Sequence, residues 1–246
     1  MNVSLSQAAA AMNANSRWQE VIAENLATSS IPGARRQELS FSSVEAGLAP
    51  GALAATGLRY MMPAAKSSIN FQQGVMRPTG NSTDLAIEGT AFFGVQLPNG
   101  SRAYTRDGEF HLNAQGQLAT KQGYTVMSDG GPLQFDSSNA SPISISPAGE
   151  VSQGADTKGR LKLVEFNDPH QLALIGDGYF VADAARPMDS PASRVKQGYL
   201  EGSNTSPTTE MAGLITAMRM FEANQRVLQS QDERMGRVIS ELGNPS

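Results

Sequence analysis

Both ends of the chain carry apolar residues at helical spacing, and this pattern constrains the fold more than any other feature. Near the C-terminus an apolar side chain recurs every seven residues, with Leu214, Phe221 and Leu228 among them. This a/d pattern predicts a long helix that packs lengthwise on other helices. From Met211 to Leu242 the helix would be roughly 45–50 Å long at 1.5 Å per residue, too long for one small domain to cover.

The N-terminal segment has a shorter stripe of the same kind, which includes Leu5, Met12 and Leu26. Isolated helices are marginal without packing, so we expect the two ends to pair with each other and then with neighbouring copies. The residues expected at this assembly interface are Leu5, Ala8, Met12, Ile22, Asn25, Leu26, Met211, Leu214, Met218, Phe221, Leu228, Met235, Ile239 and Leu242.

Polar residues interrupt both stripes, at Asn15 and Gln19 in the first and at Gln225 and Asp232 in the second. A polar residue at a seam position usually lowers stability and fixes register or partner number. The alternative is an ordinary core helix at each end, because broken stripes are common in globular proteins. We favour pairing, since it satisfies both stripes at once.

Composition excludes several classes of protein. The net charge of −4 and the absence of basic runs argue against nucleic-acid binding. The chain has no cysteine, so disulfides, thiolate metal sites and cysteine nucleophiles are excluded. No stretch approaches the roughly 20 apolar residues of a membrane span, so we expect no membrane insertion. The alanines at 8–11 follow no basic segment, and we therefore expect no cleaved signal peptide.

The first helix should end near Thr28, because Pro32 and Gly33 follow within a breaker cluster. Ser206 and Pro207 form an N-cap and first-turn pair for the last helix. These limits divide the chain into an N-terminal assembly helix, an extended connector, a β-rich central domain and a C-terminal assembly helix that pairs with the first. The expected boundaries are 1–35, 36–83, 84–200 and 201–246.

The central region has dense turn signals between short apolar runs. Asp107-Gly108 predicts a hairpin, and further turns are expected at 113–116, 129–131 and 147–149. The expected fold class is therefore α+β: a mainly-β central domain flanked by long terminal helices that pair in a coiled-coil-like manner.

One segment of the central region echoes another. Residues 85–93 resemble residues 172–180, each with an apolar run, a glycine turn and an aromatic pair. The likeness is either chance similarity between two turns or a sign of two equivalent corners of one β structure.

Residues that could carry chemistry are few. Asp107, Glu109 and His111 alternate, so they could share one strand face and bind a divalent metal. The same alternation is typical of the solvent face of a half-buried strand, which we favour. Glu109, Asp136 and Glu165 could serve a carboxylate hydrolase, but no defined spacing unites them. We expect no enzyme, no metal site and no cofactor.

Several segments, taken in chain order, resemble the motifs of one family, the axial rod proteins of the bacterial flagellar basal body. The segments are IAENLA at 22–27 with IPG at 31–33, DLAIEG at 84–89 with Phe92-Phe93, YTRDG at 104–108 with Phe110, GYLEGSN at 198–204, and Glu210-Met211 with FEAN at 221–224. The departures from the family pattern are Glu24, Ser29-Ser30, Arg35 and Thr90-Ala91.

Within the family, residues 159–163, 200–204 and 219–222 resemble the proximal-rod branch more than the distal-rod branch. The resemblance implies a structural rod subunit that polymerises through its terminal helices and helps to transmit torque from motor to hook. The implied partners are other copies, neighbouring rod and hook proteins, and the flagellar export apparatus. The implied location is the periplasm-spanning rod. The alternative from another class is a secreted β-rich adhesin or glycan-binding module.

Overall fold

The computed structural model describes residues 3–46, 60–136, 139, 141–183, 185–190 and 192–243. The chain divides into two compact units. We call Met1–Leu26, Gln37–Ser68 and Pro207–Ser246 the helical unit, and Ala27–Arg36 with Ile69–Ser206 the β unit.

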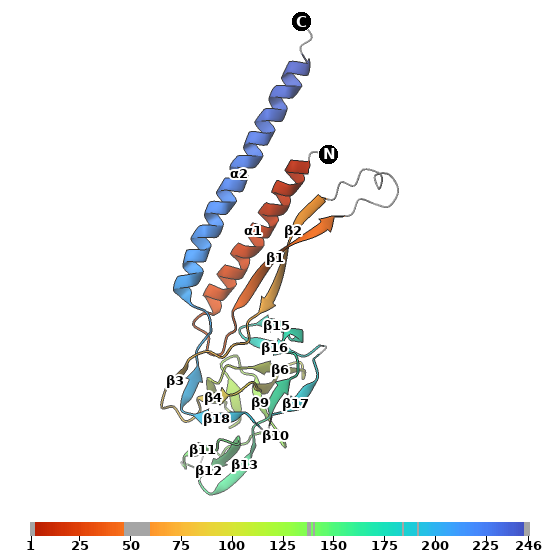
Figure 1. Cartoon of the computed structure of the whole chain (residues 1–246). Coiled ribbons are helices and arrows are strands. Elements are labelled where there is room, and N and C mark those ends of the chain that lie inside the picture. Colours follow the sequence, from red (N-terminus) through yellow and green to blue (C-terminus); the bar gives the residue numbers. More distant parts are fainter. Residues whose placement is uncertain are drawn as a thin grey trace. The chain divides into compact units, whose positions relative to one another are not determined.

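The helical unit contains two helices and a two-stranded sheet, and α1 lies between α2 and this sheet (Figure 1). The elements are α1 (Val3–Thr28), β1 (Gln37–Ala46), β2 (Tyr60–Ile69) and α2 (Pro207–Gly243). The predicted end of the first helix at Thr28 and the predicted start of the last at Pro207 are both confirmed. Trp18 of α1 meets Phe41 of β1 edge to face, with ring centroids 6.2 Å apart.

The α+β class is confirmed, but the predicted coiled-coil-like pairing of the terminal helices is wrong. The described residues form two long helices, and the seam residues Met211 and Met218 are 53% and 52% exposed. Small and polar side chains occupy the contact instead: Ala217 is fully buried, and a Cβ at Gly213 would lie 3.4 Å from Ile22 Cδ1. Small and polar residues therefore lie within this contact at positions where a coiled coil would have a regular series of apolar knobs.

The β unit consists of short strands in several small sheets around one larger sheet. Its strands are β3 (Met76–Pro78), β4 (Leu85–Glu88), β5 (Phe92–Gln96), β6 (Arg102–Thr105), β7 (Phe110–Leu112), β8 (Leu118–Thr120), β9 (Thr125–Ser128), β10 (Gly131–Pro132), β11 (Ile143–Ile145), β12 (Glu150–Gln153), β13 (Asp156–Arg160), β14 (Leu163–Phe166), β15 (Ala173–Gly176), β16 (Tyr179–Val181), β17 (Pro187–Asp189), β18 (Arg194–Gln197) and β19 (Tyr199–Glu201). A 3₁₀ turn, η1 (Pro169–Gln171), precedes β15.

The large sheet runs β15-β16-β6-β5-β9-β8-β7, and β14 joins it by pairing with both β5 and β17. Side chains on its two faces form separate apolar clusters. Because neighbours on a strand face opposite ways, Phe92 belongs to the cluster with Tyr104 and Phe180, whereas Phe93 belongs to the cluster with Phe110.

The two echoed segments flank the same strand. Tyr104 of β6 pairs with Gly94 of β5 on one side and with Phe180 of β16 on the other. Thr105 likewise pairs with Phe93 and with Tyr179. The corners themselves differ, because β15 pairs with β16, whereas β4 pairs with β18 and not with β5.

Three of the four predicted turns connect paired strands. They join β7 to β8, β9 to β10 and β11 to β12. The Asp107-Gly108 hairpin is wrong, because β6 pairs with β5 and β16 and β7 pairs with β8. Gly108 is needed for another reason: a Cβ there would lie 1.7 Å from the carbonyl oxygen of Leu85.

Candidate assembly site

Asn25 connects three elements of the helical unit. Its side-chain amide donates to the carbonyl of Gln37 at 2.8 Å and to Glu210 at 3.5 Å, and its oxygen accepts from the Gln37 amide at 2.7 Å. The side chain is buried, so these bonds form away from competing water. Asn25 therefore holds α1 to the start of β1 and to the first turn of α2.

A second polar contact lies farther along the helices, where Asn15 donates to the carbonyl of Ala217 at 3.0 Å. Asn15 was expected to interrupt the apolar stripe at a seam position, and its side chain does face α2. The inward side of α2 combines Glu210 and Ala217, which are buried, with half-buried Leu214, Phe221 and Leu228.

The outward side of α2 carries an exposed apolar stripe, made of Met211, Ile215 and Met218. These residues follow one another at helical spacings of four and three, so they share one face. Each side chain is just over half exposed. Exposed contiguous apolar residues of this kind are typical of surfaces that bind another protein. Periodicity found two of the three residues, and it missed Ile215.

The residues expected at the assembly interface differ in their surroundings. Ile22 and Asn25 are buried inside the unit, while Met211 and Met218 are exposed. Half-buried positions are Met12, Leu26, Leu214, Phe221 and Leu228. The helices also include Leu5, Ala8, Met235, Ile239 and Leu242, whose side chains lie outside the described residues.

A buried ion cluster lies in the β unit. It joins the segment that follows α1 to the segment that precedes α2. Glu201 accepts from Arg35 Nη1 at 2.6 Å and from Arg106 Nη1 at 3.1 Å, and all three side chains are almost fully buried. The Gly74 amide donates to the same carboxylate at 2.8 Å. One carboxylate thus joins segments that follow α1, precede β3 and precede α2.

Arg106 is fixed by further contacts. It donates to the carbonyl of Gly89 at 2.6 Å, and its guanidinium carbon lies 5.0 Å from the Phe92 ring centroid. Burial lowers the pKa of Arg106 to about 10, and the charge of Glu201 opposes that shift. The residue therefore stays cationic at neutral pH. Arg106 and Glu201 lie in motifs that carried the family resemblance, but their pairing gave no sequence signal.

Asn204 makes a parallel connection. Its oxygen accepts from the Arg36 amide at 2.7 Å, and its amide group donates to the carbonyls of Asn70 and Gln72, both at 2.9 Å. Two sets of contacts therefore join the segment after α1 to the segment before α2. One is the ion pair of Arg35 with Glu201, and the other is the set of hydrogen bonds made by the Asn204 side chain.

The residues considered for chemistry have structural partners. Asp107 is buried and accepts from the Glu109 amide at 2.9 Å, and burial raises the pKa of Asp107 to about 6. His111 is exposed on β7. Glu165 accepts from Thr90 and Ser190. Across the described residues, no three potential metal ligands cluster. Neither described helix has the length and apolarity to span a membrane.

Comparisons with known proteins place these features in a family. Residues 86–153 match the family described as the flagellar hook protein FlgE/F/G D1 domain, and residues 196–241 match the flagellar basal body rod FlgEFG protein C-terminal family. The chain is 32% identical to the flagellar basal-body rod protein FlgF of Caulobacter vibrioides, over 92% of both chains. It is 30% identical to FlgF of Mesorhizobium japonicum over the whole of both.

The FlgG rod protein of Caulobacter vibrioides is similar as well, at 32% identity over 94% of this chain and 96% of its own. The chain belongs to the flagellar basal-body rod protein family. The C-terminal match covers most of α2 and includes Glu201, so both the exposed stripe and the acceptor of the ion cluster lie in a region typical of rod proteins.

Proposed function

We propose that this chain is a structural subunit of the flagellar basal-body rod and assembles through its terminal helices. The observation that carries the proposal is the exposed stripe on α2, within a chain that matches rod proteins over nearly its full length. The role is mechanical: a polymer of such subunits transmits torque from motor to hook. Heterologous contacts that do not close generate a filament of this kind.

The assembly segments are residues 1–35 and 201–246, joined through 36–83 to a β-rich body at 84–200. Burial of Met211, Ile215 and Met218 against a neighbour would contribute roughly 1 kcal/mol each, about half the value for a fully exposed side chain. One contact of this size is weak. Repetition along a polymer makes it sufficient.

The partners are other copies, adjacent rod and hook proteins, and the export apparatus through which the subunit would leave the cell. Likeness in residues 159–163, 200–204 and 219–222 favours a proximal, FlgF-type position over a distal one. Nothing favours an adhesin: the only tryptophan, Trp18, is half-buried against Phe41 instead of lining an exposed groove.

The test is Met218→Asp against the control Ser230→Asp, which adds the same charge at an exposed position of the same helix, about 120° around the axis from Met218. In a strain that lacks the native protein, we expect Met218→Asp to abolish swimming and basal-body incorporation, whereas the control retains both. Circular dichroism of the purified variants checks that each keeps its fold. A folded Met218→Asp protein that still assembles would refute the proposal.

A further inference from the structure

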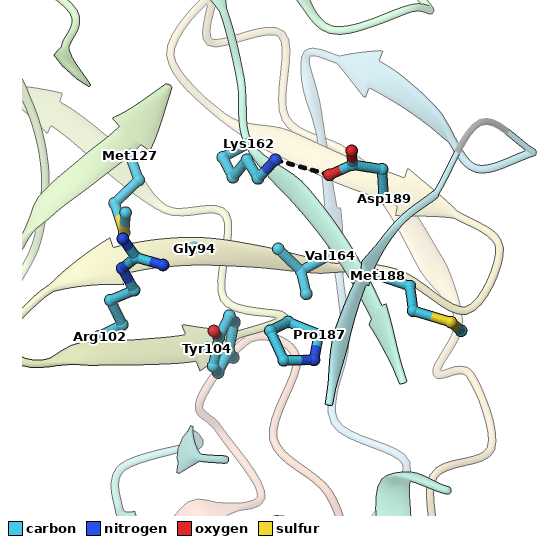
Figure 2. A pocket seen from close by; sticks show the side chains of 9 residues that line it. All are labelled: Gly94, Arg102, Tyr104, Met127, Lys162, Val164, Pro187, Met188 and Asp189. Atoms are coloured by element: carbon cyan, nitrogen blue, oxygen red, sulfur yellow. Dashed lines mark hydrogen bonds and ion pairs between the residues drawn. The ribbon is translucent and has the colours of Figure 1, made fainter. Parts of the chain in front are cut away.

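One face of the large sheet is hollowed where β5 and β6 pair. Gly94 lies directly opposite Tyr104, and paired residues share a face, so the missing side chain leaves the floor open. The hollow has a volume of about 210 Å³. Figure 2 shows Arg102 and Met127 at one end of it and Val164 between them and Met188. A Cβ at Gly94 would meet Met127 at 3.6 Å, an ordinary contact distance.

The hydroxyl of Tyr104 lies in this pocket without a hydrogen-bond partner among the described residues. The side chain is only 5% exposed, yet no described residue forms a hydrogen bond with its hydroxyl. In Figure 2 the hydroxyl is directed toward the space between Arg102 and Val164. Burial raises the pKa of Tyr104, with Arg102 and Lys162 opposing the shift, so the hydroxyl keeps its proton and can donate it. The hydroxyl is not one of the fully buried polar atoms that lack a partner, so it contacts solvent in the pocket and is accessible to a ligand.

The two cationic side chains of the pocket, Lys162 and Arg102, differ in whether they already form ion pairs. Lys162 is paired with Asp189 at 2.6 Å and with Asp129 at 3.5 Å. Arg102 is exposed, and its side chain has no ion pair or hydrogen bond with the described residues. Arg102 and Tyr104 are two positions apart on β6, so both project from the same face. A guanidinium and a phenol side by side favour a carboxylate ligand.

The volume of the pocket and its apolar lining indicate that the carboxylate belongs to a single amino-acid side chain. Pockets for drug-sized molecules hold about 300–1,000 Å³, so this one suits a single side chain. Apolar atoms of Val164 and Pro187 would contact the methylene stem of that side chain. Strand β17 beside the pocket is exposed along its length and pairs only with β14 among the described strands. Such an edge can accept an extended segment.

We propose that this pocket binds the side chain of a glutamate in an extended segment of another protein. The carboxylate accepts from Arg102 and from the Tyr104 hydroxyl, and the stem lies over Gly94 against Val164. This interaction surface is separate from the α2 stripe and does not depend on the rod function.

The test uses the full chain, labelled with ¹⁵N, and two matched peptides, acetyl-Ser-Val-Glu-Val-Ser-amide and its glutamine twin. We expect the glutamate peptide to shift the amide resonances of Gly94, Arg102 and Val164 saturably, and the glutamine peptide to bind at least tenfold more weakly. Equal binding of the two peptides would overturn the proposal. N-acetylglutamate amide tests the source of the carboxylate, and binding as tight as the peptide's would overturn the claim of a protein segment.

Variants locate the site. Arg102→Gln and Tyr104→Phe should each weaken the glutamate peptide at least fivefold, and Gly94→Ala should weaken it by filling the floor. The control is Gly130→Ala, where an added Cβ meets no atom within 4 Å. Arg102 is exposed, so its variant should fold normally, and unchanged binding by Arg102→Gln would refute the assignment.

Discussion

Removal of the Glu201 charge should destabilise the β unit strongly. Glu201→Gln keeps the shape of the side chain but leaves Arg35 and Arg106 as two buried cations without a countercharge. Breaking a buried ion pair by removing one partner typically costs about 3–5 kcal/mol, because the remaining charge stays desolvated. The side-chain amide introduced by this substitution would also place hydrogens against a guanidinium, which cannot accept them.

A matched control is Glu88→Gln. Glu88 pairs with Lys196 at 3.2 Å, but the two side chains are 55% and 44% exposed, so its loss should cost at most about 1 kcal/mol. Urea unfolding followed by far-ultraviolet circular dichroism measures both variants against the native protein. Equal urea midpoints for Glu201→Gln and Glu88→Gln would show that the buried ion cluster does not stabilise the β unit.

Two further predictions concern the β unit. Gly108→Ala should cost more than about 3 kcal/mol or prevent folding, because the new Cβ would overlap a backbone carbonyl of β4; Gly130→Ala should be nearly neutral in the same thermal melts, and a Gly108→Ala melt equal to native would contradict the structure. Asp107 has a pKa of about 6 when folded against roughly 3.9 when unfolded, so its share of stability is present below about pH 4 and is lost as the pH rises to 6, by about 3 kcal/mol in all. Asp107→Asn should therefore gain stability relative to the native protein between about pH 4.5 and 7.5 in urea titrations. A constant difference across that range would count against a buried carboxylate at this position.

The sequence predicted those features that depend on neighbouring residues. The limits at Thr28 and Pro207 follow from local breakers and caps, and the structure confirms both. The turn at residues 113–116 was also predicted correctly, because Asn113 and Gly116 favour that backbone locally. Asp107-Gly108 has the same local chemistry, but the close approach of β4 decides the conformation there. Tertiary contacts of this kind leave no local pattern.

The prediction of which side of α2 faces α1 was wrong for a related reason. Leu214, Phe221 and Leu228 lie at the edge of two faces, one with Met211 and Met218 and one with small and polar residues. Apolar periodicity predicts that the face with Met211 and Met218 packs on α1. In the structure the face with Gly213 and Ala217 packs there. The sequence did not predict the ion cluster either, because Arg35 and Arg106 are separated from Glu201 by 166 and 95 positions along the chain.

We propose that the exposed stripe of α2 becomes an interface in the rod, and cysteine labelling tests this directly. The native chain has no cysteine, so Met218→Cys and the control Ser230→Cys, which lies off the stripe, each provide a single reactive thiol. With a maleimide reagent, we expect rapid labelling at position 218 in the purified monomer and protection in isolated basal bodies. Equal labelling of Met218→Cys in both states would contradict the account.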